Sequence, residues 1–279
     1  MAEVRSIHEK ALADLLRAMD RGAIAEEGRR WIPGTPGKTS GSRWGVLYAA
    51  FPCRTLPPDH ELIIGTIWKI ERRISAGGQP VGIGWMKDGM WVAITLDNLG
   101  EALLTRDEGD AAVRYLYSTI NHGPPLYSWC EERGQEPGSE STSGDRQHLW
   151  TPVAVGRFVR DLLVMEEDDT LHLARGTARV WLEAGQKVGV KDMRTHFGRV
   201  SFGISCDWEE RTIGGFIRIE EGTAPHTALH IRLPEGWKIN GDTDRNDLAG
   251  GWIEADIFRW ERLTGEVYFS AGIDCQRRQ

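Results

Sequence analysis

The sequence has few residues that could cross-link the chain or bind a metal. Its four cysteines form no Cys-x-x-Cys pair and are widely spaced, at Cys53, Cys130, Cys206 and Cys275. This spacing does not fit the common zinc sites. A chain of 279 residues can bury a substantial core and does not need disulfide bonds for stability. We therefore expect reduced thiols, no metal and no cofactor.

Signals for membrane insertion, secretion and nucleic-acid binding are also missing. No run of about 18 apolar residues occurs, so we expect no membrane-spanning segment and no membrane partner. Residues 1–8 lack the apolar stretch of a secretory signal, and we expect a cytoplasmic protein. The net charge of −7, with no basic run to offset it, argues against nucleic acid as a partner.

The motifs of several large enzyme classes are absent. The sequence has no Gly-x-Ser-x-Gly, Walker A, Gly-x-Gly-x-x-Gly or His-Glu-x-x-His pattern, so lipase-like, nucleotide-binding and zinc-protease functions have no support. Tryptophan is abundant instead, with 12 Trp against 5 Tyr. Such a content indicates either a strongly aromatic core or a cleft in which indole rings stack on sugars. For any single tryptophan, the core is the more frequent explanation.

The first part of the chain predicts helices separated by long loops. Apolar residues recur at helical spacing in five segments, at residues 3–21, 58–75, 92–104, 108–120 and 150–166. Asp59 is the expected N-cap of the second helix. The loops between the helices carry tryptophans together with Asp or Glu, and are punctuated by Gly and Pro.

After the acidic residues 166–169 the sequence becomes β-prone. Short segments, several of which alternate apolar and polar residues, cover residues 170–175, 187–191, 199–206, 212–220, 228–233, 252–258 and 266–273. The spacing of the turns between them is typical of an antiparallel β-sandwich. We therefore expect the α+β class, with a helical domain at residues 1–168 and a β-sandwich domain at residues 169–279.

The stretch Tyr127–Gly134 is the strongest candidate for chemistry. Its adjacent carboxylates Glu131 and Glu132 follow Trp129 in a loop rich in Gly, Pro and Ser. Cleavage of a glycosidic bond needs such groups, because one carboxyl group protonates the leaving oxygen or activates water while an aromatic ring stacks on the sugar. A charged surface loop whose tryptophans pack back on the helices explains the pattern equally well.

Several segments resemble the C-terminal portion of bacterial (α/α)6-barrel glycoside hydrolases, which include glucoamylase-like and debranching-type enzymes. The resemblance is carried by residues 129–134, 144–150, 162–166, 169–176, 181–185 and 194–198. It implies a partial (α/α)6-type toroid followed by a terminal β-domain. It also implies a carbohydrate substrate, with hydrolysis of an oligo- or polysaccharide, most often a glucan, and inversion at the anomeric carbon.

The resemblance assigns roles to individual residues. Glu131 is the expected general base, with Glu132 as its competitor, and Asp88 is the candidate acid, about 6.5–9.5 Å from the base in an inverting enzyme. Asp88 precedes a glycine in a loop, so it is also explained as a turn residue without a catalytic role. The residues expected to bind substrate are Trp129, Trp150, His148, Trp85, Trp91 and Asp145. Alternatively, His148 stands at the start of a helix, where its ring forms hydrogen bonds with backbone groups.

One feature departs from this family. About five helices precede the β-prone region, whereas a complete barrel has roughly twice as many. In this family the general acid comes from the earlier half of the barrel. The chain would then act with a missing N-terminal half, complete a barrel as a homo-oligomer, or use a different acid. Two other functions remain open: a non-catalytic carbohydrate-binding or assembly module, and a structural domain whose tryptophans are core.

Four histidines lie on or beside expected strands, at His172, His196, His226 and His230. A metal site built from them would require side chains to converge from three strands. We expect no metal there.

Overall fold

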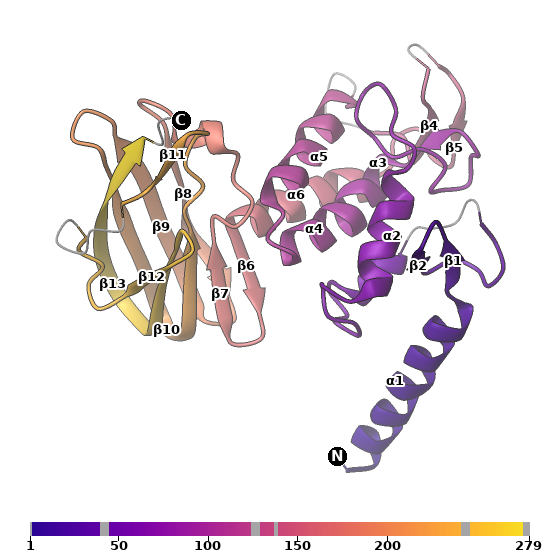
Figure 1. Cartoon of the computed structure of the whole chain (residues 1–279), viewed down its shortest axis with the longest axis horizontal. Coiled ribbons are helices and arrows are strands. Elements are labelled where there is room, and N and C mark those ends of the chain that lie inside the picture. The colour runs from indigo at the N-terminus through magenta and orange to yellow at the C-terminus, as the bar shows by residue number, and fades with distance from the viewer. Residues whose placement is uncertain (1, 40–44, 124–128, 137–138, 241–245, 276–279) are drawn as a thin grey trace. The chain divides into compact units, whose positions relative to one another are not determined.

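The computed structural model describes residues 2–39, 45–123, 129–136, 139–240 and 246–275. The chain divides into two compact units, Met1–Phe158 and Val159–Gln279. Figure 1 shows helices in the first unit and long strands in the second, which is the expected mixed α+β class. The domain boundary at residue 168, the partial toroid and the sandwich of two sheets remain predictions.

Five helical segments are present among the described residues, as the sequence predicts. They are α1 (Ala2–Gly22), α2 (Glu61–Glu71), the continuous run of α3 (Val92–Ile94), η2 (Thr95–Gly100) and α4 (Glu101–Thr105), then α5 (Gly109–Asn121) and α6 (Trp150–Leu163). A single 3-10 turn, η1 (Val46–Ala49), lies in the long loop before α2. In Figure 1, α1 extends away from the other helices, and none of its residues from Glu3 onward is buried.

Two helix ends differ from the sequence prediction. The N-cap of α2 is His60 rather than Asp59, because the Nδ1 atom of His60 accepts a hydrogen bond of 3.1 Å from the backbone N–H of Leu62. The helix α6 ends at Leu163 and not at Glu166. The residues that follow Leu163 form strand β6, whose backbone groups pair with β7 instead of continuing the helix.

The segment from Trp91 to Thr105 is the central helix of the first unit, since every one of its residues is buried. Its middle part, η2, is a π-helix, a rare variant that often marks functional sites. Gly100 allows α6 to approach closely, because a Cβ atom there would lie 2.7 Å from the Phe158 ring. Five polar side chains are buried in this helix, and they need internal partners: Thr95, Asp97, Asn98, Glu101 and Thr105.

Two small sheets complete the first unit. A hairpin of β1 (Ile24–Glu26) and β2 (Arg29–Trp31) precedes the long loop. A three-stranded sheet contains β3 (Gly89–Met90), β4 (Glu132–Gly134) and β5 (Thr142–Ser143). This second sheet joins segments more than 40 residues apart in sequence, namely the loops that carry the candidate site residues.

The second unit is built on one eight-stranded sheet. Its strands are β6 (Val164–Glu167), β7 (Thr170–Leu173), β8 (Lys187–Thr195), β9 (Gly198–Asp207), β10 (Thr212–His230), β11 (Trp237–Ile239), β12 (Trp252–Glu254) and β13 (Ile257–Cys275). The order along the main path is β11-β13-β10-β7-β6, while β9 also pairs with β10, β8 with β9, and β12 with β13. A short turn, η3 (Arg179–Leu182), follows β7.

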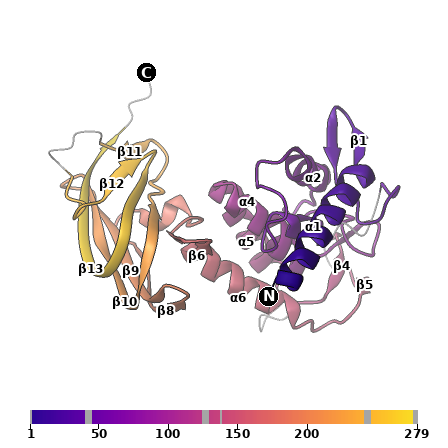
Figure 2. The ribbon, with the colours of Figure 1, turned by 90° about the horizontal axis from the view of Figure 1, so that it is seen from below.

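The long strands β10 and β13 correct the sequence prediction of two short strands in each region. Each is 19 residues long, and they run antiparallel with a register shift between Ile219 and Ala224 (Figure 2). Before the shift β10 pairs with β9, and after it β10 pairs in parallel with β7. Side chains from both parts, such as Ile217 and Leu229, belong to one hydrophobic core.

Candidate functional site

The three-stranded sheet of the first unit places the two candidate loops side by side. Gly89 lies opposite Gly134 and Met90 opposite Arg133, so residues 81–91 meet the segment that begins at Trp129. An isolated bridge pairs Trp129 with His148, and the backbone N–H of His148 donates to Trp129 at 2.7 Å. Tyr127 and Ser128 of the predicted stretch lie outside the described residues.

The carboxylate of Glu132 is enclosed by the 84–89 loop and is fully buried. It accepts hydrogen bonds of 3.0 Å from the backbone N–H groups of Trp85 and Met86. Gly84 makes this approach possible, since a Cβ atom there would lie 2.6 Å from an oxygen of Glu132. Burial raises the pKa of Glu132, the two backbone hydrogen bonds act in the opposite direction, and the charge of Glu131 adds to the rise. Glu132 therefore fixes the loop that presents Trp85.

Replacing Glu132 by Gln should lower the free energy of unfolding by about 1–3 kcal/mol, because the amide nitrogen in place of Oε1 would face the backbone N–H of Met86, which is itself a donor. Urea denaturation at neutral pH measures the loss. Glu136→Gln is the matched control, since Glu136 is an exposed residue on the same segment. Equal stability of the two variants would show that the loop does not depend on the Glu132 carboxylate.

Glu131 has different surroundings from its neighbour in sequence. It is half-buried, and its backbone N–H donates to the carbonyl of Asp145 at 2.8 Å. Its side chain lies directly against Gly144, where a Cβ atom would be 1.7 Å from a carboxylate oxygen. Gly144 also has a φ of +71°, so both its backbone conformation and its lack of a side chain suit this contact. Glu131 is thus the more accessible carboxylate of the predicted pair.

The two predicted aspartates are on the surface. Asp88 lies in the turn before β3, and its carboxylate forms an ion pair with the exposed guanidinium of Arg73. Asp145 is exposed as well, and only its backbone carbonyl contacts the candidate pair, through Glu131. Neither carboxylate is enclosed by the loops that surround Glu132.

Four of the predicted aromatic residues form a continuous row. The ring centroids of Trp85 and Trp91 are 6.0 Å apart, those of Trp91 and Trp150 are 6.1 Å apart, and those of Trp150 and His148 are 5.8 Å apart. Trp91 is buried, Trp150 and His148 are half-buried, and Trp85 is 60% exposed. The ring Nδ1 of His148 is enclosed and has no hydrogen-bond partner in the part of the chain that the structure describes. The row therefore runs from the exposed ring of Trp85 through the buried ring of Trp91 to two half-buried rings.

Trp129, in contrast, is a core residue. It is only 3% exposed, and its indole N–H donates to the carbonyl of Thr119 at 3.0 Å. Its ring packs against Gly123, where a Cβ atom would lie 2.9 Å away. This position matches the core explanation for Trp129 more closely than a sugar-stacking platform.

The central helix contributes a buried polar cluster that the sequence analysis did not identify. Asp97 accepts hydrogen bonds from the hydroxyl of Tyr48 and, at 3.3 Å, from the indole N–H of Trp150. Arg157 lies 3.0 Å from Asp97 and 3.4 Å from the buried Glu101, so it bridges two carboxylates one helical turn apart. Burial and the Asp97 carboxylate both raise the pKa of Tyr48. The cluster fixes the orientation of Trp150.

A weak signal for this cluster exists in the sequence. Asp97 and Glu101 stand four residues apart in a predicted helix that is otherwise apolar, which indicates a charged pair facing the interior. Their partners could not be identified in the same way, because Tyr48 lies 49 residues before Asp97 and Arg157 lies 60 residues after it, and no local pattern connects them.

Two of the four histidines of the second unit form a hydrogen-bonded pair, while His196 lies against Glu166 and His226 against Asp169. Nδ1 of His172 lies 3.0 Å from Nε2 of His230, and Nε2 of His172 lies 3.3 Å from a carboxylate oxygen of Glu167. Among the described residues, no group of three or more His, Cys, Asp or Glu side chains is arranged to hold a metal ion. No helix in the described ranges is long and apolar enough to cross a membrane.

Comparisons with known proteins give a partial likeness to solved structures. No protein-family model matches the chain, and no curated protein matches it. Among solved structures, it is similar to Ara127N-Se, a GH127 β-L-arabinofuranosidase from Geobacillus stearothermophilus T6, with 15% sequence identity and a TM-score of 0.37. The matched region covers 80% of this chain and 38% of that structure, so the chain spans well under half the length of this glycoside hydrolase.

Proposed function

We propose that the protein is a glycoside hydrolase that acts on an oligo- or polysaccharide, with a glucan as the favoured substrate. The observation that supports this best is the aromatic row, which ends in the exposed ring of Trp85. Its member Trp91 directly follows β3, the strand that pairs with β4 of the carboxylate segment. An exposed indole ring provides an apolar face for stacking, and neighbouring carboxylates provide acid–base groups.

Within this proposal, Glu131 activates water and Glu132 has a positioning role. Glu131 is half-buried, whereas the oxygens of Glu132 are occupied by the backbone N–H groups of the loop. The Nδ1 atom of His148 would hydrogen-bond a sugar hydroxyl, since a buried polar nitrogen without a partner costs about 1–3 kcal/mol. Trp150, held by Asp97, would contribute the inner part of the sugar platform.

The general acid is the remaining role in this proposal. Asp88 is the predicted acid, and its exposed carboxylate is paired with Arg73. In an inverting enzyme the acid would lie about 6.5–9.5 Å from Glu131, with room for water between the two. Mutation of Asp88 to Asn in an active preparation tests the role, because loss of an acid slows substrates with poor leaving groups more than activated aryl glycosides.

Product release from a panel of carbohydrates tests the function. The panel contains α- and β-linked glucans, xylan and aryl glycosides, and the wild-type chain is compared with a heat-denatured sample. The proposal predicts release from at least one member, with a glucan as the preferred polymer. Release from none of them by a folded protein would contradict the hydrolase assignment.

Replacing Trp85 by Ala should weaken binding of an accepted oligosaccharide by about tenfold, which corresponds to about 1.4 kcal/mol of lost stacking. Isothermal titration calorimetry measures the affinity. Trp252→Ala is the matched control, because Trp252 is a similarly exposed tryptophan of the second unit. If both variants bound as tightly as the wild type, Trp85 would not be a sugar platform.

A non-catalytic carbohydrate-binding module is the second candidate. It is favoured by the surroundings of the carboxylates, since Glu132 is bonded to the loop backbone and Asp88 is paired with Arg73. This candidate predicts saturable binding that depends on Trp85 with no product release. A missing N-terminal half or a second copy that supplies the acid remains a prediction.

A further inference from the structure

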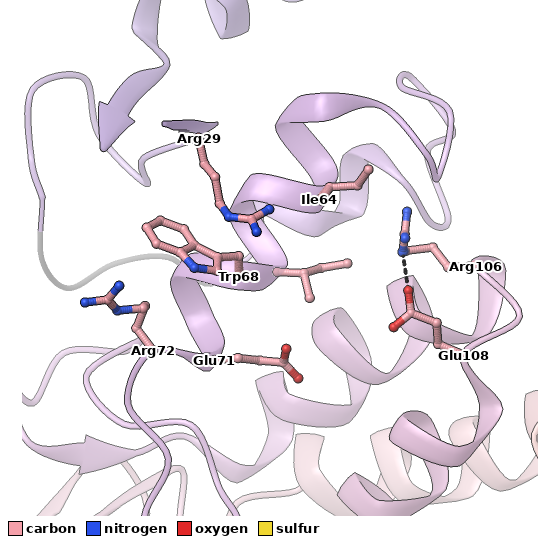
Figure 3. Close-up of a pocket in the computed structure, with 8 residues that line it drawn as sticks. Arg29, Ile64, Trp68, Glu71, Arg72, Arg106 and Glu108 are labelled. Carbon is pink, nitrogen blue, oxygen red and sulfur yellow. Dashed lines mark hydrogen bonds and ion pairs between the residues drawn. The ribbon is translucent and has the colours of Figure 1, made fainter. Parts of the chain in front are cut away.

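A pocket lies in the first unit, lined by residues outside the loops that carry the candidate site. It has a volume of about 290 Å³, close to the lower end of ligand pockets, and is formed by β2, α2 and the connection from α4 to α5. Figure 3 shows the side chains that line it, which are Arg29, Ile64, Ile67, Trp68, Glu71, Arg72, Arg106 and Glu108. Apolar surface from α2 thus meets three guanidinium groups.

Most of the charged groups in this pocket already have partners. Arg106 donates to Glu108 and to the carbonyl of Pro58, both at 2.7 Å. Arg72 pairs with Glu27, and Glu71 accepts a hydrogen bond of 2.7 Å from the hydroxyl of Tyr115. These contacts hold the walls of the pocket in place before a ligand binds.

Arg29 is the exception. Its guanidinium lies over the ring of Trp68, 5.5 Å from the centroid, and it forms no ion pair with any residue in the described ranges (Figure 3). A guanidinium above an indole ring uses its face for the cation–π contact and keeps its N–H groups for an acceptor. Arg72 and Arg106 are paired with Glu27 and Glu108, so Arg29 is the lining arginine whose charge is left for a ligand.

From this geometry we propose that the pocket binds a small organic molecule with a single carboxylate. The carboxylate pairs with Arg29, and the remainder of the molecule lies against Trp68 and the isoleucines of α2. A carboxylate matches the planar fork of a guanidinium with two parallel hydrogen bonds. A single negative charge matches the one lining guanidinium that is left without an ion pair among the described residues, whereas Glu71 and Glu108 would repel an ion with more charge.

Nuclear magnetic resonance of the ¹⁵N-labelled full chain tests the proposal through the indole N–H signal of Trp68, which is assigned by its loss in Trp68→Phe. The probes are benzoate and glucuronate, and their neutral counterparts are benzamide and glucose. We expect a saturable shift of this signal with at least one carboxylate and about tenfold weaker binding, or none, with its neutral counterpart. Comparison of benzoate with glucuronate distinguishes an aromatic acid from a sugar acid.

Two variants locate the carboxylate. Arg29→Gln should weaken binding of the carboxylate by about tenfold, while Arg5→Gln, which removes an exposed charge on α1, should leave it unchanged. The proposal is overturned if no probe gives a saturable shift, if a neutral probe binds as tightly as its acid, or if Arg29→Gln binds normally. Tighter binding of inorganic phosphate than of both carboxylates would also overturn it. The signal of Trp85 reports separately on the proposed sugar site.

Discussion

Replacement of Glu131 by Gln should lower the rate of glycoside hydrolysis by about 10²–10⁴-fold, which is the usual contribution of a general base. Gln has nearly the same shape as Glu and can keep the contact with Gly144, but it cannot take a proton from water. Glu131 is half-buried and its side chain is not involved in holding the loop, so the variant should fold normally. The turnover number on the accepted substrate measures the effect.

Glu132→Gln is the internal comparison for this experiment, because the two residues are adjacent and the substitution is the same. The structure gives Glu132 contacts with the backbone N–H groups of Trp85 and Met86, so its variant should lose stability rather than chemistry. If Glu131→Gln retained full activity and a folded Glu132→Gln lost it, the assignment of the two roles would be reversed.

Acid should destabilise the second unit because of His230. Burial lowers the pKa of His230 to about 3, and the positive charges of Arg175, Arg259 and Arg232 act in the same direction. In the unfolded chain a histidine titrates near 6.5, so between about pH 6.5 and 3 the unfolded state binds a proton that the folded state does not. Stability is therefore complete above about pH 6.5 and falls by up to about 1.4 kcal/mol for each pH unit below it.

Replacing His230 by a residue that does not titrate should remove its contribution to the pH dependence of the free energy of unfolding. We expect the wild type to lose about 2 kcal/mol from this group between pH 7 and 5, and His230→Leu to lose correspondingly less. The free energy of unfolding of the second unit, followed by amide hydrogen exchange in its strands, measures the difference. His226→Asn is the control, since that histidine is half exposed. Equal slopes for His230→Leu and wild type would contradict the buried, neutral state of His230.

The helices could be predicted from the sequence because their apolar residues recur at helical spacing. The segments predicted at 92–104 and 108–120 differ from the observed helices by no more than one residue at each end. The π-helix η2 could not be predicted, since it arises where buried Asp97 and Asn98 meet partners from distant loops. The cap at His60 was missed because its ring nitrogen replaces the more common carboxylate.

Most strands of the second unit were predicted in place but not in length, whereas β6 and β11 were not predicted. β10 and β13 were each expected as two strands, because the polar residues near Glu220 and Glu261 read as turns. In the structure the register of the pair shifts between Ile219 and Ala224, and both strands continue on the other side of the shift. The length of these strands depends on pairing with strands that are distant in sequence, and the local residue pattern therefore does not predict it.

The sequence likewise predicted some features of the candidate site and missed others. The sequence identified the segments that carry Trp85, Trp91, Glu131 and Trp150, and the structure joins them through β3 and β4. It could not separate Glu131 from Glu132, because only the folded chain shows which carboxylate the 84–89 loop encloses. Trp129 and Trp85 looked alike in the sequence, yet one is buried and the other exposed.

The central claim is that sugar binds at the aromatic row, and the indole N–H signals of the ¹⁵N-labelled Glu131→Gln chain test it most directly. This variant binds the preferred oligosaccharide of the panel without consuming it. We predict saturable shifts for Trp85 and Trp150, and unchanged signals for Trp208 and Trp237, which contact each other in the second unit. Shifts confined to the second unit, or no saturable shift with any sugar, would contradict the account.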